Sequence, residues 1–298
     1  MNQQKPHNTP GSLVARAKRV LSDPAGALAA ARVWRSWGES DENHVFLLGV
    51  PRAGTSLLAT VLACNDELVT VGDETQFFLL RNYQKLSYPG LPESDWRAMI
   101  EASRSRAELF DKLAAHYIAQ KDSASRFFEK TPGHALHMTK LAQAFPKAQF
   151  VFCVRDPRDA FASMKRAKNL PKPSLENYTS FYNELCNQYL SVDSSRTHLV
   201  AYEELVSEPS AIVPATCDFL GVPYSEHMLD PEVHAANAPV YGQREHHKRI
   251  GEPISPKSIG SWKKTLSEAE ASYLVENTRG KLTELGVADV VFGAQQRG

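Results

Sequence analysis

The chain has 298 residues, of which 34 are lysine or arginine and 34 are aspartate or glutamate, so its formal net charge is zero. This length accommodates one large domain or two small ones with an ample core, and the charge balance argues against a general nucleic-acid binder. The four cysteines are far apart in sequence, which excludes a compact CxxC metal site and argues against a disulfide scaffold.

The N-terminal region combines basic and apolar residues. The sequence has no run of about 18 apolar residues and begins with a polar stretch, so we expect no membrane-spanning helix, no signal sequence and a cytoplasmic enzyme. Residues 12–37 interleave arginine and lysine with leucine, valine and tryptophan, which is typical of helices packed on a domain or of a basic arm on a membrane surface. Pro24 and Gly26 interrupt this pattern and favour the packed helices.

Residues 44–62 predict a strand, a loop and a helix. An apolar run of strand length is followed by a turn rich in glycine and proline, and then by apolar residues at helical spacing. The free N–H groups and the positive dipole end of such a helix point into the loop and make it an anion site. A tight turn without a ligand is the alternative.

The spacing of Gly49 and Gly54 in this loop matches the nucleotide P-loop, but Thr55 stands where that motif has lysine. The lysine of nucleoside triphosphate hydrolases reaches the β- and γ-phosphates. A loop without it should hold one phosphate rather than a triphosphate. The cation lies inside the loop instead, as Arg52.

Two further predicted strands end in charged residues. Residues 68–71 lead to Asp73 and Glu74, and residues 126–130 end in Lys130, just before Thr131 and a helix that starts at Pro132. Ligands of open parallel sheets bind beyond the carboxyl ends of the strands, so these side chains are candidates for a ligand crevice. A solvated lysine is the alternative for Lys130.

Residues 148–154 form a nearly continuous apolar run, as expected of a central parallel strand buried on both faces. Arg155 follows it, with Asp156 as a predicted helix N-cap. An arginine at the end of a buried strand needs an anion, which is either Asp159 or a phosphate. Ser163 lies about two helical turns further on and could share that phosphate only if Arg155 reaches along the helix.

The remaining pattern completes one α/β domain. Residues 94–121 predict cap helices, 174–192 a helix, 197–202 a strand, 203–220 a helix interrupted by Pro209 and Pro214, 221–260 a long functional or disordered loop, and 267–285 a helix with a capping box. We expect an α/β fold with a P-loop-type parallel β-sheet flanked by helices and a helical cap. Residues 1–42 form an N-terminal helical arm and 43–292 the α/β domain.

Three motifs in this order resemble those of the sulfotransferases that use 3′-phosphoadenosine 5′-phosphosulfate (PAPS): residues 51–56, 129–132 and 154–163. The resemblance covers roughly residues 44–265. It implies that the 5′-phosphate is held by the first loop, and the 3′-phosphate by an arginine, a serine and a tyrosine, with a late loop closing over the cofactor. The matching residues are Arg52, Ala53, Gly54, Thr55 and Ser56, then Arg155, Ser163 and Tyr202, and in the closing loop Lys257 and Ser258.

Arg52 stands where the cytosolic small-molecule members have lysine, which resembles the bacterial, carbohydrate and tyrosylprotein branches and implies a bacterial protein. The cytosolic members carry a catalytic histidine where this chain has Pro132, and His134 is nearby but shifted. Glu74 matches the glutamate base of the tyrosylprotein sulfotransferases. Whether Glu74 or His134 is the base stays open at this stage.

The resemblance implies transfer of a sulfuryl group from PAPS to an acceptor hydroxyl, without a metal, leaving adenosine 3′,5′-bisphosphate (PAP). Glu74 is expected to take the proton, and Arg52 and Lys130 to neutralise developing charge. A P-loop kinase and a catalytically silent nucleotide-binding homologue are the alternatives. A sugar, a tyrosine, a lipid and a secondary metabolite all remain open as acceptors, as does the oligomeric state.

Overall fold

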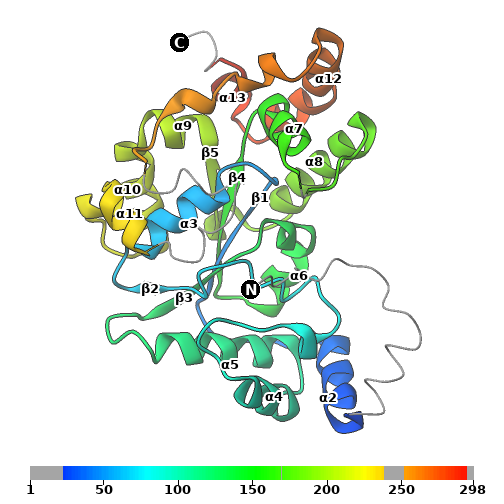
Figure 1. Cartoon of the computed structure of the whole chain (residues 1–298), viewed down its shortest axis with the longest axis vertical. Helices are drawn as coiled ribbons and strands as arrows, with labels where there is room; N and C mark the ends of the chain where they lie inside the picture. Colours follow the sequence, from blue (N-terminus) through cyan, green and yellow to red (C-terminus); the bar gives the residue numbers. More distant parts are fainter. Residues whose placement is uncertain (1–22, 169, 238–251, 294–298) are drawn as a thin grey trace.

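The computed structural model describes residues 23–168, 170–237 and 252–293. The described chain is built on one parallel sheet with the strand order β2-β3-β1-β4-β5 (Figure 1). The strands are β1 (Val45–Gly49), β2 (Leu68–Val69), β3 (Arg126–Lys130), β4 (Gln149–Val154) and β5 (Thr197–Ala201). Since the strands are parallel, their carboxyl ends share one edge of the sheet.

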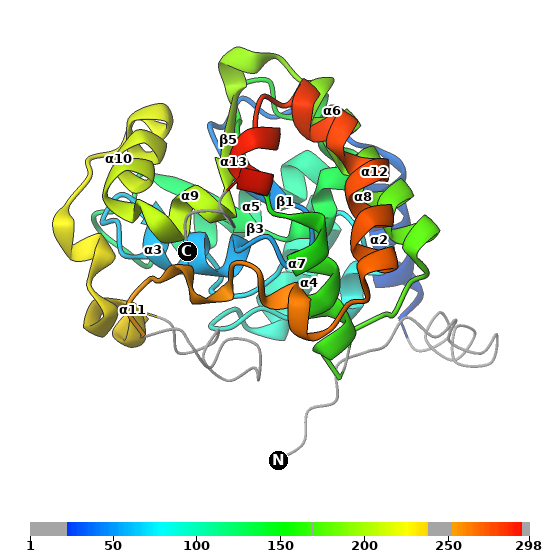
Figure 2. The same cartoon turned by 90° about the horizontal axis from the view of Figure 1, so that it is seen from above.

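Helices cover both faces of the sheet, as the sequence predicts for a P-loop-type fold (Figure 2). On one side lie α3 (Thr55–Ala63), α10 (Pro209–Leu220) and α11 (Pro231–Asn237), and on the other α7 (Pro157–Arg166), α8 (Leu175–Leu190) and α12 (Glu268–Glu284). Shorter helices are α6 (Met138–Ala144), α9 (Tyr202–Ser207) and α13 (Ala288–Gly293). Short 3₁₀ turns lie at Tyr83–Lys85, Pro132–His137, Ser194–Arg196, Glu226–Leu229, Pro256–Ser258 and Ser261–Lys264.

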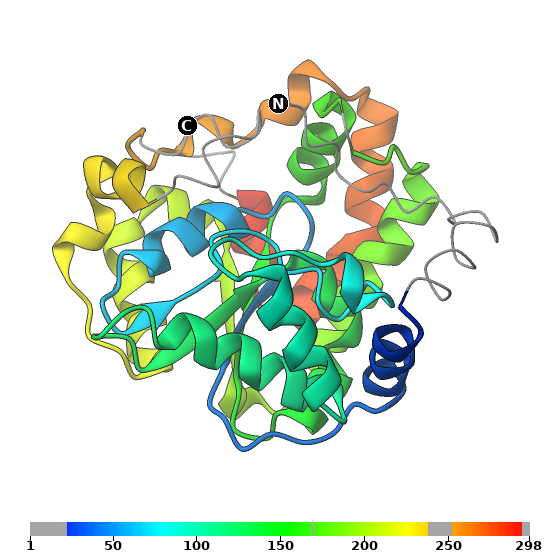
Figure 3. The ribbon, with the colours of Figure 1, turned by 60° about the horizontal axis from the view of Figure 1, so that its bottom comes forward.

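The cap is formed by α4 (Glu93–Ala102) and α5 (Arg106–Ile118), which lie together at the front of Figure 3. The helix α2 (Pro24–Arg35) packs on this cap, because Arg32 donates to the carbonyls of Glu101 and Ser103. Residues 24–35 therefore pack on the domain. Residues 12–22 of the predicted arm lie outside the described residues, and the division at residue 43 stays a prediction.

None of the described helices is long and apolar enough to cross a bilayer. The cytoplasmic location expected from the sequence stays a prediction. Buried apolar residues between Ala29 and Val291 form one cluster, which joins the helices to the sheet.

Several predicted element boundaries need correction. The second strand has only two residues, and the predicted helix after Pro132 begins as a 3₁₀ turn before α6. Pro209 does separate two helices, but Pro214 lies inside α10 and does not interrupt it. Pro214 removes one backbone hydrogen bond of the helix. The helix tolerates this loss because the buried side chains of Val213 and Cys217 pack on the core. The capping box at Ser267 and the N-cap at Asp156 are confirmed.

A buried carboxyl group, that of Glu203, lies behind the ends of β4 and β5. Glu203 is 2% exposed, and its Oε1 accepts a hydrogen bond from the N–H of Asp156 at 2.9 Å. Its Oε2 has no hydrogen-bond partner among the described residues. Burial raises the pKa of Glu203 to about 8, although the hydrogen bond from Asp156 opposes the rise. The raised pKa favours a proton on the Glu203 carboxyl in the folded protein.

This proton makes stability depend on pH. The pKa of Glu203 is higher in the folded state than its ordinary value of 4.5, so its stabilising contribution is complete below pH 4.5 and is lost as the pH rises towards 8. We expect Glu203→Gln to match the wild type in urea denaturation at pH 5 and to be more stable at pH 8. The gap should grow by up to about 1.4 kcal/mol per pH unit. Parallel stability profiles for the two proteins would contradict this account.

Candidate active site

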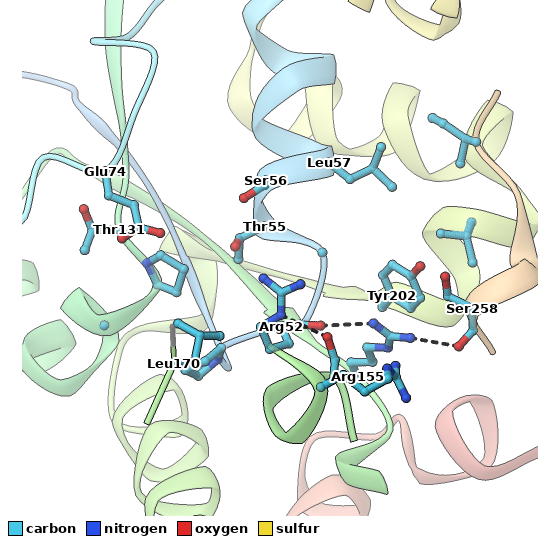
Figure 4. Close-up of a pocket in the computed structure, with 18 of the residues that line it drawn as sticks. Arg52, Thr55, Ser56, Leu57, Glu74, Thr131, Arg155, Leu170, Tyr202 and Ser258 are labelled. Atoms are coloured by element: carbon cyan, nitrogen blue, oxygen red, sulfur yellow. Dashed lines mark hydrogen bonds between the residues drawn. The ribbon is translucent and has the colours of Figure 1, made fainter. Parts of the chain in front are cut away.

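A cavity of about 450 Å³ lies beyond the carboxyl ends of the strands (Figure 4). This size is typical of a small-molecule site. Its wall includes residues from all the strand ends that the sequence analysis selected. They are Arg52, Gly54, Thr55 and Ser56 after β1, Glu74 and Gln76 after β2, Thr131, Pro132 and Gly133 after β3, Arg155, Ser163 and Arg166 after β4, Tyr202 after β5, and Ser258.

The loop after β1 is shaped by close packing. Gly49 has a φ of 147°, and a Cβ there would lie 2.3 Å from the carbonyl oxygen of Cys153. Gly54 has a φ of 85°, and a Cβ there would lie 2.5 Å from the ring of Tyr202. The helix α3 begins directly after Gly54 without a side-chain cap, so its first N–H groups face the cavity. The anion site that the sequence places at this loop stays a prediction.

Ala53 and Lys257 do not lie on the cavity wall. The side chain of Ala53 is buried, and its N–H donates to the carbonyl of Val50. Lys257 is exposed in a 3₁₀ turn, whereas its neighbour Ser258 faces the cavity. Of the predicted cofactor-binding residues, these two are the ones that do not line the cavity.

Arg52, Arg155 and Ser163 are brought into one contact chain. Arg52 Nε donates to Ser163 Oγ at 3.0 Å, and Arg155 Nη1 donates to the carbonyl of Arg52 at 3.2 Å. The guanidinium of Arg155 also stacks on Tyr202, 4.0 Å from the ring centre, and donates to the carbonyl of Ser258 at 2.9 Å. Arg52 thus contacts both Arg155 and Ser163, which are separated along the chain.

The cavity is strongly positive at this end. Burial lowers the pKa of Arg52, and the neighbouring Arg155 and Arg166 lower it further, while Glu74 opposes them. Arginine remains charged despite such shifts, so the three guanidinium groups repel one another. Arg155 Nε is buried and has no hydrogen-bond partner among the described residues. An anion with several oxygen atoms in the cavity would relieve the repulsion.

One of the two sequence hypotheses made Asp159 the anionic partner of Arg155, and the structure gives Asp159 other partners. Its buried carboxylate accepts hydrogen bonds from Gly260 N at 2.8 Å, Ser261 Oγ at 3.0 Å and Trp262 N at 2.8 Å. Asp159 therefore holds the segment around Ser258 in place beside the cavity. No spacing rule connects two segments about 100 residues apart, which is why the sequence did not reveal this contact.

Glu74 and Lys130 meet at the other end of the cavity. Lys130 is fully buried, which makes the solvated alternative wrong, and its Nζ lies 3.6 Å from Glu74 Oε1 and 3.5 Å from Ser56 Oγ. Glu74 lies on the cavity wall, with 28% of its side chain exposed. Lys130 contacts these two cavity residues, Glu74 and Ser56, but does not itself line the cavity.

His134 is taken up by the core and does not face the cavity. It is fully buried, its Nδ1 lies 2.9 Å from Glu129 Oε2, and its Nε2 accepts from the N–H of Phe78 at 3.1 Å. Glu129 also accepts from the hydroxyls of Thr75 and Thr131. Burial opposes ionisation of Glu129, but His134 and the two hydroxyls outweigh it and lower its pKa. Of the two candidate bases, only Glu74 reaches the cavity.

Sequence reasoning missed Gln76 and Arg166, which both line the cavity. Arg166 lies three residues after Ser163 on α7, so helical spacing places the two side chains on one face and could have revealed it. Gln76 gave no comparable signal, because its position depends on a turn with an unusual backbone conformation.

Comparisons with known proteins agree with this geometry. The model of the sulfotransferase family matches residues 44–226. Protein-tyrosine sulfotransferase 2 of Gallus gallus is 28% identical over 218 residues, covering 64% of this chain and 57% of that protein. Protein-tyrosine sulfotransferase A of Caenorhabditis elegans is 24% identical over 242 residues, covering 75% and 62% respectively. The chain thus spans less than two thirds of the length of these two relatives.

Among solved structures, the sulfotransferase domain of the Synechococcus PCC 7002 olefin synthase aligns with a TM-score of 0.56 at 21% identity. The alignment covers 81% of this chain and 97% of that domain. The sulfotransferase domain from the curacin biosynthetic pathway aligns with a TM-score of 0.54, also at 21% identity, over 80% and 98%. These likenesses show the fold. Since the family model covers more than half of the residues, the chain belongs to the sulfotransferase family, the family of PAPS-dependent enzymes that its motifs predict.

Proposed function

We propose that this protein transfers a sulfuryl group from PAPS to an acceptor hydroxyl, with Glu74 as the general base. The observation that carries the proposal is one cavity whose wall holds both the arginine cluster and Glu74, with the buried Lys130 in contact with Glu74. When bound, PAPS supplies the sulfuryl group. The N–H groups at the start of α3 and Arg52 would hold its 5′-phosphate, and Arg155 and Ser163 its 3′-phosphate, beside Tyr202.

The chemistry then depends on the residues near Ser56. A sulfuryl group carries one negative charge where a phosphoryl group carries about two, so side-chain cations and amides suffice to stabilise its transfer, by analogy with phosphoryl transfer. Glu74 takes the proton from the acceptor hydroxyl, and Lys130 and Arg52 neutralise charge on the transferred group and the bridging oxygen. Lys130 is close both to Ser56, at the start of the phosphate-binding helix, and to the proposed base Glu74.

The acceptor is proposed to be a hydroxyl compound: a sugar, a tyrosine, a lipid or a secondary metabolite. The names of the two animal relatives favour including a tyrosyl hydroxyl in any acceptor panel. A suitable panel contains a tyrosyl peptide, a monosaccharide, a fatty alcohol and para-nitrophenol. Transfer of radiolabelled sulfate from PAPS to at least one of them would support the proposal, and no transfer to any hydroxyl compound would count against it.

We expect Glu74→Gln to lower kcat about 10²- to 10⁴-fold, because an amide of the same shape cannot accept the proton. Binding of PAP should be retained, because Glu74 is not one of the proposed phosphate-binding residues and the substitution keeps the shape of the side chain. The measurement is kcat with the best acceptor of the panel, together with calorimetric titration of PAP. Glu93→Gln on the exposed surface of α4 is the control. A Glu74→Gln variant that works at the wild-type rate would rule out Glu74 as the base.

Arg155→Ala should weaken the binding of PAP by about 10- to 100-fold, since a charge-assisted hydrogen bond contributes roughly 1.5 to 3 kcal/mol. Adenosine 5′-monophosphate lacks the 3′-phosphate and serves as the control ligand, so its affinity should change little. Both affinities are measured by calorimetry. Equal losses for the two nucleotides would show that Arg155 does not hold the 3′-phosphate.

We also propose that transfer needs no metal ion. Within the described ranges, no group of three or more histidine, cysteine, aspartate or glutamate residues could hold one. Because a sulfuryl group carries one negative charge, side-chain cations suffice for its transfer, so the rate should be the same with and without the chelator EDTA, measured with the same acceptor. A rate that falls with chelator and returns when Mg²⁺ is added would contradict this and would favour the kinase alternative.

A further inference from the structure

Gln76 has a strained backbone at the acceptor end of the cavity. Its φ is 55°, in the left-handed region that glutamine rarely adopts. Several contacts hold it there. Its N–H donates to Thr131 Oγ1 at 3.2 Å, and its carbonyl accepts from the N–H groups of Leu79 and Leu80, both at 3.1 Å. Such strain persists where the surroundings fix the conformation, and it often accompanies a functional requirement.

The conformation places the Gln76 side chain against Glu74. Its Nε2 donates to Glu74 Oε2 at 2.6 Å, while Glu74 Oε1 lies 3.6 Å from Lys130 Nζ. The two carboxylate oxygens are thus contacted from different directions by an amide and by an ammonium. Thr75, between the two residues, is buried and donates to Glu129 instead. The side chain of Thr75 therefore points into the core, whereas Glu74 and Gln76 lie together on the cavity wall.

We propose that Gln76 is a positioning residue for Glu74, an inference that rests on the proposed role of Glu74 as the base. A glutamate side chain has several rotatable bonds, and one contact with Lys130 leaves the carboxylate free to turn about it. The second contact, from Gln76, fixes the plane of the carboxylate and so the direction of its remaining lone pairs. Catalytic groups need this kind of support, because small errors in placement are costly to the rate.

Gln76→Asn separates this role from a purely structural one. Asparagine adopts the left-handed region more readily than glutamine, so the turn should be kept and thermal stability should be equal or higher. Its amide is one methylene shorter and cannot make the 2.6 Å contact with Glu74. We expect kcat to fall about 10- to 100-fold, as for the loss of a hydrogen bond to a charged group. The KM for PAPS and the affinity for PAP should not change.

A second variant, Gln76→Gly, removes both the strain and the side chain, and should give the same loss of kcat without loss of stability. Unchanged kcat in these two folded variants would overturn the proposal. A higher KM for PAPS in both variants, with kcat unchanged, would also overturn the proposal, because it would place Gln76 in cofactor binding.

Combining Gln76→Asn with Glu74→Gln distinguishes the two proposals. If Gln76 acts through Glu74, the double variant should be no slower than Glu74→Gln alone. Equal effects of Gln76→Asn in both backgrounds would overturn the positioning role while leaving the base in place. Full activity of Glu74→Gln would overturn the base, and the positioning role with it. All rates use the acceptor that gives the fastest transfer in the panel.

Discussion

The structure depends on holding three arginine side chains close together at one edge of a parallel sheet. Arg52, Arg155 and Arg166 share one cavity, and their mutual repulsion is one reason that the pKa of Arg52 is lowered. The hydrogen-bond and stacking contacts of each guanidinium with the described residues are with uncharged groups. Arg52 bonds Ser163, Arg155 stacks on Tyr202, and Arg166 donates to Thr265 and Ser261. The fold thus gathers three positive charges in one cavity, where Glu74 opposes part of their effect on Arg52.

The third strand organises the opposite end of the cavity. Glu129 and Lys130 are neighbours on β3, so their side chains point to opposite faces of the sheet. Glu129 joins Thr75, Thr131 and His134 in a buried network that anchors the turn carrying Glu74. Lys130 meets Glu74 itself. Burying a lysine without a partner costs free energy, and the contact with Glu74 offsets part of that cost. The same positive charge of Lys130 is the one that the proposed chemistry uses.

The sequence predicts much of the site because parallel strands end at one edge, so charged residues after separate strands converge. This reasoning selects Arg52, Glu74, Lys130 and Arg155, which all lie in or beside the cavity. It fails where a contact joins distant segments, as with Asp159 and residues 260–262. It also cannot tell whether a side chain near the site faces the cavity or the core, as with His134. It also fails at Gln76, whose place depends on a left-handed backbone that glutamine does not favour.

The central claim is that the cavity is fitted to an adenosine with phosphates at both the 5′ and 3′ positions, and not to a triphosphate with magnesium. Calorimetric titration of the wild-type protein with PAP and with ATP plus Mg²⁺ tests it most directly. The account predicts that PAP binds at least about tenfold more tightly, which corresponds to roughly 1.4 kcal/mol. Equal or tighter binding of ATP with Mg²⁺ would contradict it.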